Sequence, residues 1–100
     1  MATYNKLVRD KIPEILDKKG ISYEKRIASP EEYKTELVTK LQEEVDEFKA
    51  ETDIEELADV MEVLESLKNL PEYSGAEEVR LRKREERGGF DDRIILKGEK

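Results

Sequence analysis

The 100-residue chain contains no cysteine, no histidine and no tryptophan. The absence of cysteine excludes a disulfide framework and thiol chemistry. The absence of histidine excludes acid–base catalysis by an imidazole and metal sites built on histidine. No apolar run approaches the roughly 20 residues that a membrane-spanning helix needs, and no signal peptide is visible at the N-terminus. We therefore expect a cytoplasmic protein without a membrane partner.

Charge is abundant, and it is unevenly spread. Charged residues make up 45% of the chain, and the net charge is −7. Residues 31–79 carry four basic and seventeen acidic groups, whereas residues 1–30 and 80–100 each have a net charge of +3. An acidic middle between basic ends can hold cations in the middle and phosphates at the ends; alternatively, the ends only neutralise the middle. The long acidic stretch argues against duplex nucleic acid as a partner.

The chain is short enough to form a single domain over residues 1–100. Within it, the starts of two helices are well marked. Ser29 and Pro30, followed by Glu32, form a capping box that predicts a helix from residue 30 to about residue 51. Asp53 is a second N-cap candidate, and it predicts a helix from residue 54 to about residue 70, where Pro71 follows.

Shorter elements are predicted on either side of these two helices. Asp10 can cap a helix that ends at Gly20, and Ser74 can cap another that ends at Gly88-Gly89. We expect residues 1–9 to be extended or irregular and residues 21–28 to form a loop with short extended character. Residues 94–96 are expected to form a short extended tail.

Two pairs of acidic residues, each spaced i, i+3, lie in the two long helices: Glu44 with Glu47, and Glu56 with Asp59. On a helical wheel, Glu44 and Glu56 fall inside the apolar arcs of their helices, and their partners lie at the edges. Ionised carboxylates at the margin of a core are costly unless they are paired or bind a metal. Four hard oxygen ligands suit Mg²⁺ or Mn²⁺ better than zinc.

A plainer interpretation of the acid pairs stays open. With 26 acidic residues in 100, some i, i+3 pairs arise by chance on solvated faces. Glu56 is also the third residue after the Asp53 cap, which gives it a place in a capping box.

The helix predicted from residue 54 is apolar over most of its circumference, more than one small bundle can cover. We therefore predict a homodimer or homotetramer.

The pattern Glu-x-x-Glu, a spacer, then Glu-x-x-Asp resembles the all-α NTP pyrophosphatases, which include the MazG proteins. The flanking pieces are similar to a MazG-like subgroup termed phosphoribosyl-ATP pyrophosphohydrolase-like. The matching segments are residues 4–13, 40–44, 55–59 and 87–90. The resemblance covers almost the whole chain, although the eight-residue spacer between Glu47 and Glu56 is shorter than in most relatives.

The resemblance implies an all-α helical bundle of about four helices, completed by oligomerisation. It also implies Mg²⁺-dependent hydrolysis of the α–β phosphate bond of a nucleoside triphosphate, which would serve to clean the nucleotide pool. The metal ligands it implies are Glu44, Glu47, Glu56 and Asp59. Catalytic roles would fall to Glu43, Glu44 and Glu47, with Glu43 in an outer-shell or base role.

Basic residues are candidates for binding the substrate's phosphates, because charge-assisted hydrogen bonds to phosphate are strong. The candidates are Arg9, Lys11, Lys40, Arg84 and Arg87. Each of them can instead form a surface ion pair. Two further functions also stay open: phosphoribosyl-ATP as the substrate, in histidine biosynthesis, and a non-catalytic helical oligomer or regulatory binding module.

Overall fold

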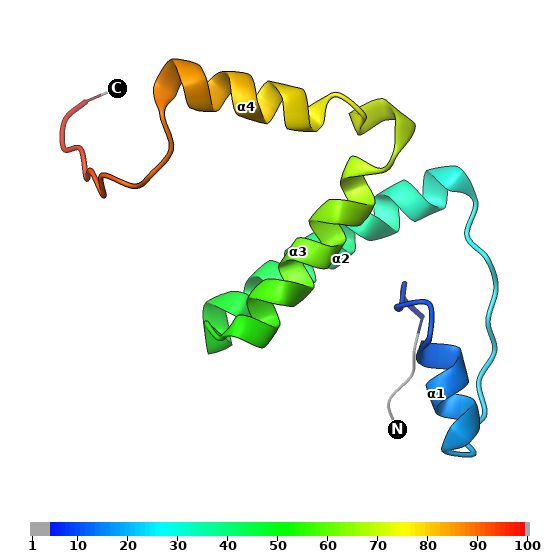
Figure 1. Cartoon of the computed structure of the whole chain (residues 1–100). Helices are drawn as coiled ribbons and strands as arrows, with labels where there is room; N and C mark the ends of the chain where they lie inside the picture. The colour runs from blue at the N-terminus through cyan, green and yellow to red at the C-terminus, as the bar shows by residue number, and fades with distance from the viewer. Residues whose placement is uncertain (1–4, 100) are drawn as a thin grey trace.

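The computed structural model describes residues 5–99, and Tyr4, the residues before it and Lys100 lie outside this range. The fold is all-α, as predicted. It consists of α1 (Ile12–Lys18), α2 (Pro30–Glu51), α3 (Ile54–Lys68), the 3₁₀ turn η1 (Pro71–Tyr73) and α4 (Ala76–Arg87) (Figure 1). Residues 5–99 contain no β-strand, so residues 21–28 and 94–96 are irregular.

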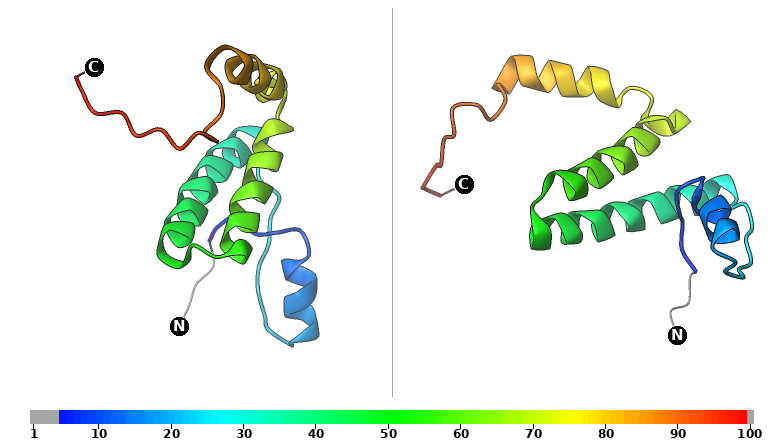
Figure 2. Two further views of the ribbon diagram at one scale, coloured as in Figure 1. Left: turned by 60° about the vertical axis from the view of Figure 1, so that its left-hand side comes forward. Right: turned by 60° about the horizontal axis from the view of Figure 1, so that its bottom comes forward.

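The centre of the structure is an antiparallel hairpin of α2 and α3 (Figure 2). The N-caps predicted for these two helices, Ser29 and Asp53, are confirmed. The Ser29 hydroxyl accepts a hydrogen bond from the Glu32 amide at 3.2 Å, and Asp53 Oδ1 accepts one from the Glu56 amide at 2.8 Å. Thr52 turns the chain between the helices in the left-handed region, with φ of 47°. The short connection fixes how the two helices face each other, and this arrangement positions the acid pairs.

The apolar core of a single chain is very small. Among the described residues, only Leu37 and Val63 are buried hydrophobic side chains. The radius of gyration is 17.8 Å, against about 13 Å for a compact domain of 100 residues. Neither α1 nor α4 packs along the hairpin, and α4 extends away from it (Figure 2). The α3 side chains Leu57, Met61 and Leu64 consequently stay exposed.

Two predicted caps are wrong. Helix α1 starts one residue later than expected, with Lys11 rather than Asp10 at the cap position and no side-chain cap. Helix α4 is preceded by Gly75 rather than Ser74. Ser74 already has helical dihedral angles, φ −59° and ψ −23°, because η1 begins at Pro71; a side-chain cap needs an extended residue instead.

The glycines that were predicted to end α1 and α4 do so. Gly20 and Gly88 have φ of 70° and 80°, a region that L-residues with a side chain rarely adopt.

No helix in the described part of the chain has the length and hydrophobicity needed to cross a bilayer.

Candidate metal centre

The α2–α3 hairpin brings the two predicted acid pairs together. Carboxylate oxygens of Glu44, Glu56 and Asp59 lie within 4.8 Å of one another, and so do oxygens of Glu43, Glu44 and Glu47. Glu44 belongs to both groups, so it joins the acids of α2 to those of α3. We refer to these five residues as the acid cluster. It therefore contains all four predicted metal ligands as well as Glu43.

Glu44 is the most deeply placed member of the acid cluster. It is only 7% exposed, and its Oε2 atom is buried without a hydrogen-bond partner. Its Oε1 atom lies 3.3 Å from Lys40 Nζ, one helical turn earlier. Burial raises the pKa of the Glu44 carboxyl, the nearby Glu47 raises it further, and Lys40 opposes both. A buried acceptor with no partner costs free energy, which a bound cation would recover.

Glu56 supplies a second such oxygen from the facing helix. It is half-buried, and its Oε2 atom is also buried without a hydrogen-bond partner. The pKa of the Glu56 carboxyl is raised, first by burial and then by the negative charges of Glu47 and Asp59. Two residues that each have a buried, unpartnered oxygen, one on each helix, thus belong to one group of carboxylates. A solvated acidic face would not have this property.

Cationic side chains contact the acid cluster. Arg9 Nη2 lies 2.7 Å from Asp59 Oδ1, and Lys6 Nζ lies 3.1 Å from Glu43 Oε1. Lys40 Nζ lies 3.6 Å from the same Glu43 oxygen. The Lys6 ammonium holds the pKa of the Glu43 carboxyl below its ordinary value. Glu43 is therefore better suited to holding lysines at the site than to accepting a proton.

The predicted phosphate-binding residues separate into two groups. Lys40 and Arg9 contact the acid cluster, and Lys11 is exposed two residues after Arg9. Arg84 and Arg87 lie on α4, which extends away from the hairpin (Figure 1). A single chain therefore does not bring these two arginines to the acid cluster.

The Gly88-Gly89 pair has a local role beside Arg84. The Gly88 amide donates to the Arg84 carbonyl at 2.8 Å, which ends α4. A Cβ atom on Gly89 would lie 3.0 Å from Arg84 Nη1, so the missing side chain makes room for the guanidinium.

Lys6 is the residue at the site to which the sequence analysis gave no role. Its partner Glu43 is 37 positions away in the sequence, and no spacing pattern links the two. The only available signal was its place in the segment that carries the resemblance, three residues before Arg9.

Comparisons with models of known protein families, with curated proteins and with solved structures found no match to this chain.

Proposed function

We propose that this chain is a Mg²⁺- or Mn²⁺-dependent nucleotide pyrophosphohydrolase. It would hydrolyse the α–β phosphate bond of a nucleoside triphosphate, or of a related nucleotide, to a monophosphate and pyrophosphate. The observation that carries the proposal is Glu44 Oε2, a buried acceptor without a partner among carboxylates from two helices. The reaction follows from the motif resemblance to the MazG-like NTP pyrophosphatases, and the physiological role would be removal of unwanted nucleotides from the pool.

The donor set fits the proposed ion. Glu44, Glu47, Glu56 and Asp59 offer only hard oxygen ligands, which suit Mg²⁺ and Mn²⁺. When bound, such an ion neutralises phosphate charge and lowers the pKa of a coordinated water. Glu47 is exposed at the rim of the acid cluster, where its carboxylate can orient a water molecule. Glu43 holds Lys6 and Lys40 beside the cluster in an outer-shell role.

Substrate phosphates would be bound by the cations that already contact the acid cluster. Lys40 and Arg9 are in place, and Lys11 is exposed close to Arg9 in the sequence. Arg84 and Arg87 can take part only if a second copy of the chain brings its α4 to the site. A homodimer or homotetramer would also cover the exposed α3 side chains, of which Met61 is 57% exposed.

The test is pyrophosphate release from a panel of nucleoside triphosphates and phosphoribosyl-ATP, in Mg²⁺ and in EDTA. The proposal predicts release from at least one triphosphate in Mg²⁺ and none in EDTA. Release from phosphoribosyl-ATP alone would indicate a role in histidine biosynthesis instead. Full activity in EDTA would refute the metal site. No release from any nucleotide would favour a non-catalytic oligomer or regulatory module.

A further inference from the structure

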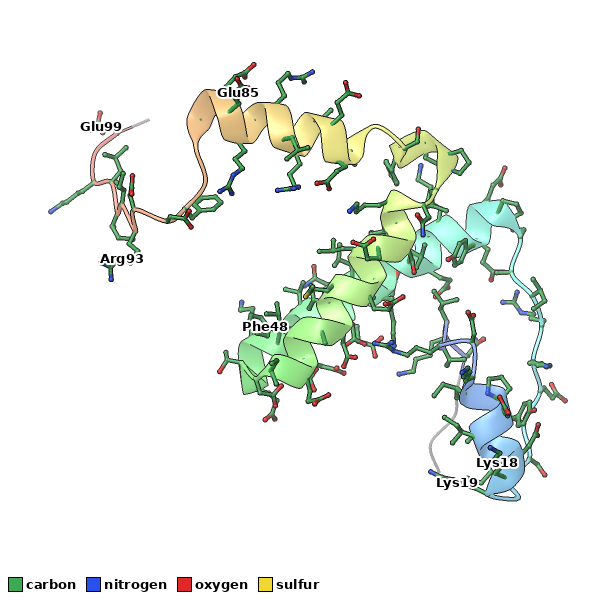
Figure 3. All side chains as sticks on the ribbon, viewed as in Figure 1. Lys18, Lys19, Phe48, Glu85, Arg93 and Glu99 are labelled. Carbon is green, nitrogen blue, oxygen red and sulfur yellow. The ribbon has the colours of Figure 1, made fainter. Side chains whose placement is uncertain are left out.

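The segment before α1 contacts the acid cluster on both helices of the hairpin. We call residues 5–11 the N-terminal strap. Lys6 pairs with Glu43 on α2, and Arg9 pairs with Asp59 on α3. Leu7 and Val8, between the two cations, are half-buried. Figure 3 shows side chains of this segment directed toward the hairpin. The strap is thus attached through carboxylates of the cluster itself.

The Arg9 contact falls on a proposed metal ligand. Its guanidinium is 2.7 Å from Asp59 Oδ1, while Asp59 also has a carboxylate oxygen within 4.8 Å of oxygens of Glu44 and Glu56. A divalent cation held by these three carboxylates would repel a guanidinium at Asp59, because two like charges would share one anion. Binding of the metal would therefore weaken the Arg9–Asp59 ion pair.

We propose that Arg9 is a displaceable cation: it neutralises Asp59 in the metal-free protein, and it leaves Asp59 for a substrate phosphate when the metal binds. This inference rests on the proposed function. The Arg9 side chain is 57% exposed, so it can change partner without disturbing packed neighbours. Its planar guanidinium is suited to two parallel hydrogen bonds with phosphate oxygens. A nucleotide at the metal would place such oxygens next to the strap.

The weakening of the Arg9–Asp59 ion pair by a metal has a measurable consequence. Because the two cations are linked through one carboxylate, removing the guanidinium must strengthen metal binding. The Arg9–Asp59 pair is exposed, so the gain is modest, about two- to fivefold in affinity. Removing it must also weaken phosphate binding to the metal-loaded protein, by about tenfold for a lost charge-assisted hydrogen bond.

The test is Mn²⁺ binding, followed by the electron paramagnetic resonance signal of the free ion, first without any phosphate compound. Wild type is compared with Arg9→Gln and with Arg26→Gln. Arg26 is a matched control because it forms an exposed pair with Glu32, at 2.5 and 2.6 Å, outside the acid cluster. Pyrophosphate is then titrated into each Mn²⁺-loaded protein by calorimetry.

We expect Arg9→Gln to bind Mn²⁺ about two- to fivefold more tightly and pyrophosphate about tenfold more weakly, with Arg26→Gln like wild type. Arg9→Lys keeps the positive charge but lacks the planar guanidinium group, so its Mn²⁺ and pyrophosphate affinities should be intermediate. If circular dichroism shows that Arg9→Gln is unfolded, Arg9→Lys is used in its place. Unchanged or weaker Mn²⁺ binding in the Arg9 variants would overturn the inference, and so would unchanged pyrophosphate binding. Both results leave the proposed function standing. A wild-type protein that binds no Mn²⁺ would overturn both.

Discussion

The α2–α3 hairpin and α4 are both rich in acidic residues, but their carboxylates have opposite environments. On α4, Glu77 pairs with Arg80 one turn later and lies 3.2 Å from Lys68 Nζ. These contacts lower the pKa of the Glu77 carboxyl to about 2, with the Arg80 hydrogen bond as the largest cause. On the hairpin, the pKa values of Glu44 and Glu56 are raised, chiefly by burial.

Acid content alone therefore does not define a site. Helix α4 has basic residues within a turn of its acids, and Lys68 at the end of α3 also contacts Glu77, so the charge of Glu77 is compensated by nearby cations. In the hairpin, a second acidic helix faces the first, and fewer basic side chains lie near the acids. Buried oxygens without partners arise only there among the described residues.

Turnover should respond most strongly to a change in the hairpin. Glu44→Gln keeps the size of the side chain and removes the charge of a proposed ligand. We expect the rate of pyrophosphate release to fall by on the order of 10², as it does when a key electrostatic group is lost. Glu85→Gln, on the exposed face of α4, serves as the control. The measurement is the initial rate in saturating Mg²⁺. Wild-type turnover in Glu44→Gln would show that the hairpin does not form the catalytic site.

The next effect is on assembly. We expect wild-type protein at micromolar concentration to be at least a dimer, with α2 and α3 in the interface. Met61→Lys places a charge on the exposed apolar side of α3 and should lower the mass measured by light scattering to that of a monomer. Leu81→Lys makes the same kind of change on α4, where Leu81 is 51% exposed; it should leave the mass unchanged. A monomeric wild type would contradict the prediction, as would a larger effect of Leu81→Lys.

The pH dependence of stability should have opposite signs in the two regions. The raised pKa of Glu44 means that the folded, metal-free protein binds its proton more tightly than the unfolded chain does. The ionised Glu44 carboxylate therefore destabilises the folded protein. This destabilisation is relieved as the pH falls from neutral toward the ordinary glutamate pKa of about 4.3. The lowered pKa of Glu77, about 2, contributes stability above about pH 4.3 that is lost as the pH falls toward 2.

Urea unfolding midpoints in EDTA at pH 7, 5 and 3 can test both signs. Relative to wild type, Glu44→Gln should be more stable at pH 7 and lose that advantage at lower pH. Glu77→Gln should be less stable at pH 7 and approach wild type at pH 3. If both variants shift in the same direction at pH 7, the two carboxylates do not have the opposite environments described above.

The smallest effect is expected from Glu85→Gln itself. Glu85 is exposed on α4 (Figure 3). Its replacement should change the free energy of unfolding by less than about 0.5 kcal/mol, as surface substitutions usually do. Equilibrium urea unfolding at pH 7 measures this, and a loss well above that limit would mean that α4 is covered by a partner.

The sequence predicted the parts of the site that depend on local chemistry. Ser29 and Asp53 marked the starts of α2 and α3 because N-capping is a short-range interaction. The helical wheel placed Glu44 on the apolar side of α2, where the structure buries it. The hairpin then follows from the short connection at Thr52.

What the sequence could not provide depends on long-range contacts. Arg9 and Asp59 are 50 positions apart, and no periodicity relates them. Ser74 looked like a cap because the preceding η1 turn could not be recognised from residue types alone. The separation of α4 from the hairpin is likewise decided by tertiary packing, so the sequence grouped Arg84 and Arg87 with Arg9 although one chain holds them apart.

Glu44 is the residue through which we propose that the acid cluster binds a divalent cation. The most direct test is the melting temperature of metal-free protein with increasing Mg²⁺, for wild type, Glu44→Gln and Glu77→Gln, because a ligand that binds only the folded state raises the melting temperature with its concentration. We expect a concentration-dependent rise in the melting temperature of wild type and Glu77→Gln, and little or none in Glu44→Gln. An equal rise in all three proteins, or none in wild type, would contradict it.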